Sequence, residues 1–194
     1  ALGGWIRLDR VSVLFGSHHH VVCYPLPHRQ AINVAVFAEA AAPEGGSGPA
    51  IRSKGDMRLA AILAAGQGHW TAWPLYSVEA VLWHKGNIGL IGDAAHAMLP
   101  FQAQGAAMGI EDAAALAPLL VSEADAQSAF ARYAEMRQPR VRRVAKTSER
   151  NGTIFHLPWP GSAARNFVIR AQGSRAHLRR LGWLYGYDPP APQD

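Results

Sequence analysis

The chain has 194 residues, of which 49% are hydrophobic and 17% are charged, and its formal net charge is +5. This balance is typical of an ordinary globular protein and excludes an intrinsically disordered chain. We expect neither a membrane span nor a secretory signal, because no apolar run approaches the roughly 20 residues of a spanning helix and ALGGWIRLDR alternates polar and apolar residues.

The N-terminal forty residues predict strands. Four short segments are rich in Val, Ile and aromatic residues and are separated by turn-prone residues, namely GWIRLD, VSVLFG, HHVVCYPL and INVAVFA. Together they indicate an antiparallel meander with one covered face. In the third segment the period of two places His18, His20, Val22 and Tyr24 on one face and His19, Val21 and Cys23 on the other.

The rest of the chain predicts mainly helices. Residues 56–65 form a short amphipathic helix, and NIGLIGD, which ends at Asp93, is a buried strand that enters a turn. Three longer helices are expected near residues 104–121, 124–150 and 162–180. Pro118 predicts a kink or an early end near Ala117 in the first of them, and Pro139 predicts an interruption of the second.

The positive charge is concentrated in the C-terminal third. Residues 132–194 contain 12 of the 19 Lys and Arg but only four acids. The basic run RYAEMRQPRVRRVAKTSER lacks interleaved aromatic residues and accompanies no nucleic-acid-binding motif, so a solvated helix face explains it best. A partner surface and the steering of an anionic substrate remain open, and we expect no nucleic-acid or membrane partner. The single cysteine, Cys23, excludes an internal disulfide and indicates the cytoplasm.

The stretch GDAAHAMLPFQAQGAAMGIEDAAAL, residues 92–116, has the features of a ligand site. Asp93 follows an apolar strand, at the place where open α/β sheets bind ligands, and its carboxylate suits the hydroxyl groups of a sugar. Gly92 permits a close backbone approach. The helix that opens at Gly105, Ala106 and Ala107 offers unpaired N–H groups to an anion. An isolated Gly-Asp would be a simple tight turn, but chance rarely produces these features in this order.

This stretch resembles the second flavin-binding motif of the FAD-dependent aromatic hydroxylases, the family of p-hydroxybenzoate and salicylate hydroxylases. HHHVVCYPL resembles the H-x-x-x-Y-P strand of the family's substrate domain. YAEMRQPRVRRVAKTSERNG resembles its Y-x-x-x-R-x-P-R helix, and WLYGYD is similar to the end of the salicylate-hydroxylase-like branch. The resemblance covers nearly the whole chain.

The resemblance implies a role for particular residues. Asp93, with Gly92 before it, would bind the ribitol of FAD, and the backbone at Gly105, Ala106 and Ala107 would contact the N1/C2 edge of the flavin. Pro100 would lie beside the isoalloxazine ring, where flavin and substrate meet. His20 and Tyr24 would face the aromatic substrate, which agrees with the strand parity.

The implied fold combines an α+β part with an α/β part. Residues 1–75 would be a partial substrate-binding domain, an antiparallel sheet with a short helix. Residues 76–194 would be the C-terminal part of the FAD-binding domain, with long helices. The implied function is hydroxylation of a small, salicylate-like aromatic acid with FAD, O2 and NADH or NADPH.

The chain departs from the family pattern in two ways. Ala97 stands where the family usually has Pro, which changes only the loop. The strand–GxGxxG–helix unit that holds the ADP part of FAD is missing, since GQGHWT at 66–71 lacks the third glycine. We therefore expect the C-terminal half of a hydroxylase, whether a truncation, a proteolytic product or a degenerate gene. Without its N-terminal half it should be colourless, lack the substrate-ionising base and self-associate through exposed apolar surface.

Other readings are weaker but open. A non-enzymatic remnant that folds and associates without FAD is one, and a quinone-ring or polyketide-ring flavin hydroxylase is another. Metal binding at His18 and His20 is disfavoured because no acid or cysteine lies near them in sequence, so we expect no metal. His96 is expected to make a structural hydrogen bond rather than to act in catalysis.

Overall fold

A computed structural model describes residues 6–39, 51 and 56–188 of the chain. The chain divides into two compact units. Unit 1 comprises Ala1–Pro74 with Thr153–Val168, and unit 2 comprises Leu75–Gly152 with Ile169–Asp194. A segment from the C-terminal part of the sequence therefore returns to the N-terminal unit.

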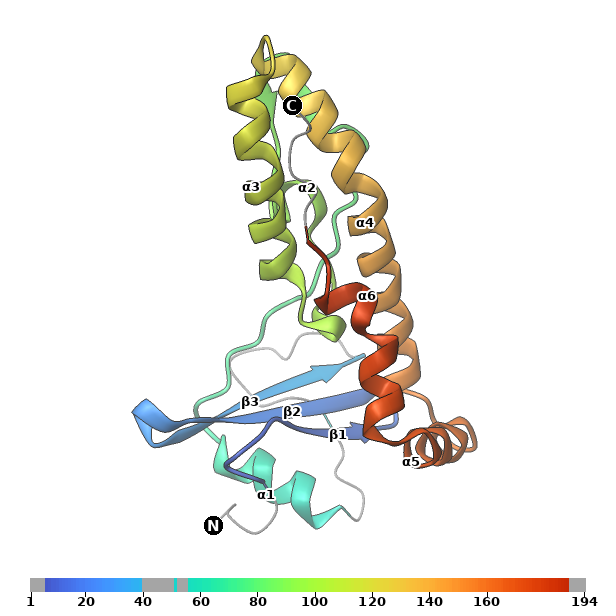
Figure 1. Cartoon of the computed structure of the whole chain (residues 1–194). Helices are drawn as coiled ribbons and strands as arrows, with labels where there is room; N and C mark the ends of the chain where they lie inside the picture. Colours follow the sequence, from blue (N-terminus) through green and yellow to red (C-terminus); the bar gives the residue numbers. More distant parts are fainter. Residues whose placement is uncertain (1–5, 40–50, 52–55, 189–194) are drawn as a thin grey trace. The chain divides into compact units, whose positions relative to one another are not determined.

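Unit 1 is built on an antiparallel sheet in the order β1 (Ser12–Gly16), β2 (His19–Leu26) and β3 (Ala31–Ala38), shown in Figure 1. Three of the four expected strands are confirmed, and the 3-10 helix η1 (Pro27–Arg29) joins β2 to β3. The prediction of a strand over GWIRLD is wrong for its described part, because residues 6–10 form a bend and a turn. Ile6 is buried in the core there, and the carboxylate of Asp9 accepts hydrogen bonds from Arg7 and Arg10 at the surface.

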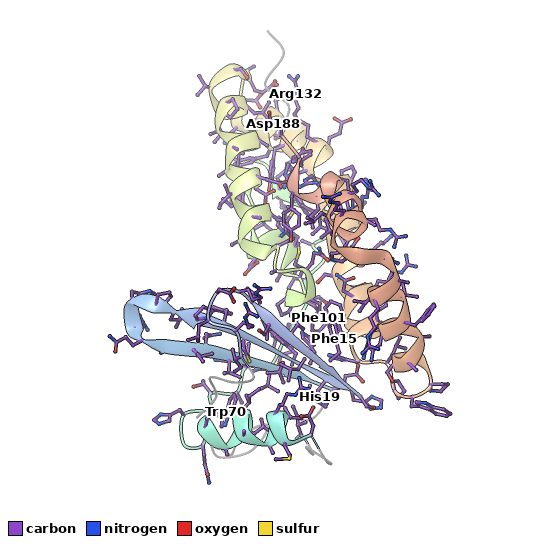
Figure 2. All side chains as sticks on the ribbon, turned by 60° about the horizontal axis from the view of Figure 1, so that its bottom comes forward. Phe15, His19, Trp70, Phe101, Arg132 and Asp188 are labelled. Atoms are coloured by element: carbon purple, nitrogen blue, oxygen red, sulfur yellow. The ribbon has the colours of Figure 1, made fainter. Side chains whose placement is uncertain are left out.

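The two faces of this sheet differ in chemistry. Val21 and Cys23 point to the face covered by α1 (Met57–Ala65), where they pack with Leu59 and Ile62. Oδ1 of Asp56 caps that helix by accepting hydrogen bonds from the backbone N–H groups of residues 58 and 59. Trp70 lies beside the helix (Figure 2), against Gly66.

The opposite face carries the polar and aromatic residues. Phe15, His20 and Phe37 are directly paired across the three strands, and Tyr24 has the same parity as His20. The predicted alternation along β2 is thus confirmed. His18 is the exception, because it lies in the turn before the strand with φ of 60°.

Unit 2 is mainly helical. It contains the hairpin β4 (His84–Lys85) and β5 (Ile88–Gly89), then α2 (Asp93–His96), the 3-10 helix η3 (Pro100–Gln102) and α3 (Gly105–Ser122), with α6 (Gly182–Tyr185) near its end. Two helices are shared with unit 1, α4 (Ala126–Phe155) and α5 (Gly161–Arg180), and Gly173 in α5 is non-helical with φ of 65°. In Figure 1, α3 and α4 lie side by side with α2 between them. Figure 2 shows side chains filling that space; Trp83, Met108, Leu119, Tyr133 and Val144 form its core.

Neither proline ends its helix, so the early end near Ala117 and the interruption at Pro139 are wrong, while a kink at Pro118 stays a prediction. α3 continues through Pro118 and α4 continues through Pro139. Each proline removes the hydrogen bond to the carbonyl four residues earlier, at Ala114 and Glu135. Both of those residues are exposed, so water can solvate the carbonyl while the buried face keeps the helix intact.

The expected buried strand at NIGLIGD is also wrong. β5 has only two residues and pairs with β4, while Ile88 is 72% exposed and Ile91 is 44% exposed. Further exposed apolar side chains precede it, at Tyr76, Val81 and Leu82. The segment is apolar as expected, but in the described part of unit 2 the sheet that contains it has only the two short strands β4 and β5.

α3 alone among the described helices is long and apolar enough to cross a membrane by length and composition. The expectation that no run would reach that length is therefore corrected. Core helices of soluble proteins pass the same test. α3 packs Met108 and Leu119 into the core of unit 2 and buries the carboxylate of Asp112 there.

Candidate functional site

The turn before α2 requires a glycine. Gly92 adopts φ 56° and ψ −139°, a conformation that residues with a Cβ rarely reach. Its backbone passes close to α3, because a Cβ at Gly92 would lie 3.8 Å from the Cα of Gly109. The turn therefore sets Asp93 directly against α3.

Asp93 and the start of α3 form one local site. Asp93 is exposed at the first position of α2, and its Oδ1 lies 3.9 Å from the point that a Cβ of Gly105 would occupy. Gln104 makes no side-chain hydrogen bond to cap α3. The first N–H groups of α3, at Gly105, Ala106 and Ala107, thus lie next to a carboxylate at the positive end of the helix dipole. The carboxylate can accept hydrogen bonds from hydroxyl groups of a ligand, and the N–H groups can donate to an electron-rich edge of the same ligand.

α4 anchors the loop that carries Pro100, which is half-buried at the first position of η3. Oγ of Ser148 donates a hydrogen bond of 2.5 Å to the carbonyl of Leu99. The ring of Phe101 packs on Gly152, where a Cβ would come within 2.5 Å of it. Nδ2 of Asn151 donates to Oε1 of Gln102. The loop is therefore held in place at several points.

Behind the Gly92 turn lies a buried ionic contact that sequence reasoning missed. The carboxylate of Asp112 accepts hydrogen bonds from the N–H of Gly92 at 3.0 Å, from Nε2 of His96 at 2.6 Å and from Nε of Arg137 at 2.9 Å. Asp112 and Arg137 are completely buried. Burial alone would raise the pKa of Asp112, but the hydrogen bonds from His96 and Arg137 hold it below its usual value. Burial likewise opposes the charge of Arg137, yet Asp112 and Glu111 raise its pKa.

Glu111 extends this contact to the end of the chain. Arg140 donates two hydrogen bonds of 2.6 Å to its carboxylate, and Nη1 of Arg137 lies 2.7 Å from its Oε2. Arg140 also donates to the carbonyls of Trp183 and Leu184, and its guanidinium lies 3.6 Å from the ring centroid of Tyr187. We call Glu111, Asp112, Arg137 and Arg140 the ion cluster. The ion cluster connects three motifs that carry the family resemblance, namely residues 92–116, the Y-x-x-x-R-x-P-R helix and WLYGYD.

Part of this arrangement was detectable in the sequence. His96 makes the structural hydrogen bond that was expected of it. The acids at 111 and 112 are adjacent, and Arg137 and Arg140 are three residues apart on one helix face. The spacing within each pair indicates that its two members contact the same group, but it does not show that the acids contact the arginines.

Unit 1 places the two expected substrate-facing residues on one face of β2. Tyr24 is 37% exposed, whereas His20 is 2% exposed. The ring of His20 stacks on Phe37 with centroids 4.6 Å apart, and its Nδ1 lies 2.8 Å from Nε2 of His156. Burial, with the nearby charge of His156, lowers the pKa of His20 from 6.5 to about 4. No sequence signal pointed to His156, which lies 136 residues away.

The described residues contain no group of three or more His, Cys, Asp or Glu side chains that could hold a metal ion. A cavity of about 140 Å³ in unit 2 is lined by residues that include Trp83, His96, Leu99 and Val141. It includes neither Asp93 nor Gly105, so it is separate from the site at the start of α3.

Known proteins resemble this chain in both sequence and fold. The FAD binding domain family matches residues 60–148. The chain is 33% identical to 3-amino-4-hydroxybenzoate 2-monooxygenase PtmB3 of Streptomyces platensis, with 95% of this chain and 51% of that protein covered. It is 30% identical to 3-hydroxybenzoate 6-hydroxylase of Klebsiella oxytoca, with 94% and 48% covered.

The fold comparison agrees. A salicylate hydroxylase solved as a substrate complex aligns with a TM-score of 0.67 at 24% identity, with 95% of this chain and 51% of that chain covered. The chain spans about half the length of the curated relatives it matches. The resemblance carried by residues 92–116 is thereby confirmed, since the chain is similar to FAD-dependent aromatic hydroxylases over about 95% of its own length.

Proposed function

We propose that the chain is part of a flavoprotein monooxygenase that hydroxylates a small aromatic acid. The cofactor would be FAD, and NADH or NADPH would reduce it. One oxygen atom of O2 would enter the ring and the other would leave as water, with a hydride (two electrons and one proton) taken from the nicotinamide and one further proton taken from solvent. The single observation that carries the proposal is the carboxylate of Asp93 beside the first N–H groups of α3.

The residues at this site fit a flavin. Hydroxyl groups of the ribitol can donate to Asp93, and the absence of a Cβ at Gly105 leaves room for a close approach. When bound, FAD supplies the activation of oxygen, while the protein supplies binding and electrostatics. The N–H groups of Gly105, Ala106 and Ala107 would stabilise negative charge on the edge of the ring. The anchored Pro100 loop would hold one side of the ring and exclude water.

The remaining assignments belong to the same proposal. Residues 1–75 would bind the substrate through His20 and Tyr24, and residues 76–194 would bind the ribitol and ring of FAD. The ADP part of FAD would be bound outside residues 1–194, which the half-length matches to relatives support. A salicylate-like acid is the substrate class that we favour. The buried, unpaired Cys23 supports a cytoplasmic location.

The test compares two aspartates in the protein expressed from its complete reading frame. Asp93→Ala should weaken FAD binding at least tenfold in a flavin-fluorescence titration, because it removes the acceptor for the ribitol. Asp188→Ala is the matched control, an exposed aspartate of the same unit, and should leave the affinity unchanged. Equal affinities in the two variants would remove the assignment of Asp93.

Self-association is proposed on a separate observation. The exposed apolar side chains of residues 75–91 form a surface that water solvates poorly, and a second copy of the chain could cover it. Light scattering after gel filtration should give a dimer or larger species for the wild type. A Val81→Ser, Ile88→Ser double variant should shift it towards the monomer; a monomeric wild type would exclude this surface as a self-association site.

A further inference from the structure

Two neighbouring hydroxyl groups of α4 form hydrogen bonds in different directions. Oγ1 of Thr147 donates to the carbonyl of Arg143 at 2.8 Å, one turn earlier in the same helix, which is a common partner for a hydroxyl inside a helix. Oγ of Ser148 instead donates to the carbonyl of Leu99, 49 residues away in the sequence. Ser148 is completely buried. Its hydroxyl therefore serves the loop that leads into Pro100 and not its own helix.

We propose that Ser148 is a positioning residue of the flavin site, because its hydroxyl sets the orientation of the Pro100 ring and thereby keeps water from the side of the isoalloxazine ring that Pro100 covers. The inference rests on the proposed function, in which Pro100 lies beside that ring. It adds which residue fixes Pro100 and what the loss of that residue does to the flavin.

The peptide between Leu99 and Pro100 determines where the proline ring lies. This peptide is planar, and its nitrogen is part of the ring. Proline has no N–H, so the carbonyl of Leu99 is the only polar group of this peptide that a hydrogen bond can hold. The bond from Ser148 therefore fixes the plane to which the ring is attached. Leu99 has φ of −60° and ψ of 142°, the extended conformation that a following proline favours.

The loop after Pro100 contains a strained residue. Ala103 has φ of 54° and ψ of 37°, which is uncommon for a residue with a Cβ, and its N–H donates to the carbonyl of Pro100 at 3.0 Å. Such conformations persist where the surrounding structure determines them, and they gather at ligand sites. α4 provides that support from one helix face, because Asn151 and Gly152 lie three and four residues after Ser148 and also contact the loop.

Access of water to the flavin would change the products of the reaction. In the proposed hydroxylation, one oxygen atom of O2 enters the substrate. In an open site, the same hydride from the nicotinamide and one proton from solvent would reduce O2 to H2O2, and the substrate would stay unchanged. A closed site prevents side reactions of this kind. A displaced Pro100 should therefore increase both the exposure of the bound flavin and the share of O2 that leaves as H2O2.

The first test reads the loop without flavin. In residues 1–194, NMR gives the 13C shift of the Leu99 carbonyl, which reports on its hydrogen bond. Ser148→Ala removes the donor and should move this shift towards that of a carbonyl without a donor. Ser148→Thr keeps a hydroxyl and should keep the wild-type shift. Thr147→Ala is the matched control, because it removes the adjacent hydroxyl, and it should leave the shift unchanged. An unchanged shift in Ser148→Ala would overturn the proposal.

The second test reads the flavin in the protein expressed from its complete reading frame. Quenching of flavin fluorescence by iodide measures how far the bound ring is open to solvent. The quenching constant should rise severalfold in Ser148→Ala and stay at the wild-type value in Ser148→Thr and Thr147→Ala. With salicylate as the probe substrate, the share of NADH or NADPH consumption that yields H2O2 should rise in Ser148→Ala. Ser148→Cys has a weaker donor and should change both readouts less, which keeps the test decisive if Ser148→Ala does not fold.

The outcomes separate this inference from the proposed function. A changed carbonyl shift with unchanged iodide quenching would overturn the role of Ser148 at the flavin. If salicylate is not hydroxylated, the favoured substrate class is wrong, and iodide quenching still decides the role of Ser148. A complete protein that binds no FAD would refute the proposed function and with it this role, while the carbonyl shift would still show whether Ser148 holds the loop.

Discussion

The described part of each unit contains a polar cluster with buried members, and the two clusters differ in their chemistry. The ion cluster of unit 2 consists of two carboxylates and two guanidinium groups. In unit 1, His18, His20, Glu39 and His156 form what we call the histidine cluster, which contains one carboxylate and three imidazoles. The first holds a backbone turn in place through the N–H of Gly92, and the second joins the sheet of unit 1 to His156.

Their surroundings also differ. Asp112 and Arg137 are completely buried, so each charge depends on the other for solvation. In the histidine cluster Glu39 and His18 are exposed, whereas His20 is buried. The comparison therefore predicts a large structural penalty for changes in the ion cluster and a pH-dependent effect for changes in the histidine cluster.

The largest effect is expected for Asp112→Ala. It leaves the buried guanidinium of Arg137 without its main partner and releases the N–H of Gly92. Loss of one partner of a buried ion pair costs about 3–5 kcal/mol. Urea denaturation followed by circular dichroism measures the change, with the exposed Glu135→Ala on α4 as the control. A loss below about 1 kcal/mol would mean that the ion cluster does not hold the turn.

The next effect is a pH dependence confined to unit 1. The pKa of His20 is lowered from 6.5 to about 4, so the unfolded chain binds a proton at a higher pH than the folded chain does. Stability is therefore complete above about pH 6.5 and is lost as the pH falls towards 4, by at most about 3 kcal/mol at 1.36 kcal/mol per pKa unit. Unit 2 should keep its stability over this range, because the pKa of Asp112 is lowered below 3.8 and its contribution is lost only at lower pH.

Amide hydrogen exchange at several pH values separates the two units. Val21 and Cys23 report on unit 1, and Met108 and Val144 report on unit 2. Protection in unit 1 should fall first as the pH is lowered, and His20→Phe should flatten its pH dependence. A simultaneous fall in both units would contradict the contrast between the clusters.

A smaller effect is expected for Gly92→Ala. The positive φ of Gly92 with ψ near −139° costs a residue with a Cβ about 1–3 kcal/mol. Gly182→Ala is the control, because no atom lies within 4 Å of a Cβ there and its φ is not positive. Thermal unfolding should therefore distinguish the two variants, and an equal midpoint would show that the turn relaxes without strain.

The features that were predicted correctly from the sequence depend on signals from neighbouring residues. The Gly92 turn, the start of α3 at Gly105 and the alternation of β2 each depend on residues close together in the chain, and all three are present. In contrast, the exposure of a residue and its contacts with distant residues depend on how separate segments of the chain pack together. That is why NIGLIGD was expected to be buried, and why His156 was not connected with His20. Pro118 and Pro139 show the same limit, since both helices continue through the proline and the residues four positions earlier are exposed.

The smallest effect sharpens the assignment of Asp93. Its side chain is exposed and makes no hydrogen bond with the part of the chain that the structure describes, unlike Asp112 on the other side of the same turn. Asp93→Ala should therefore change the free energy of unfolding by less than about 0.5 kcal/mol, as at other exposed sites. Urea denaturation beside Asp112→Ala measures both aspartates on one scale. A stable Asp93→Ala variant with weakened FAD binding would separate a ligand-binding carboxylate from a structural one within a single motif. A loss of stability comparable to that of Asp112→Ala would instead make Asp93 part of the scaffold.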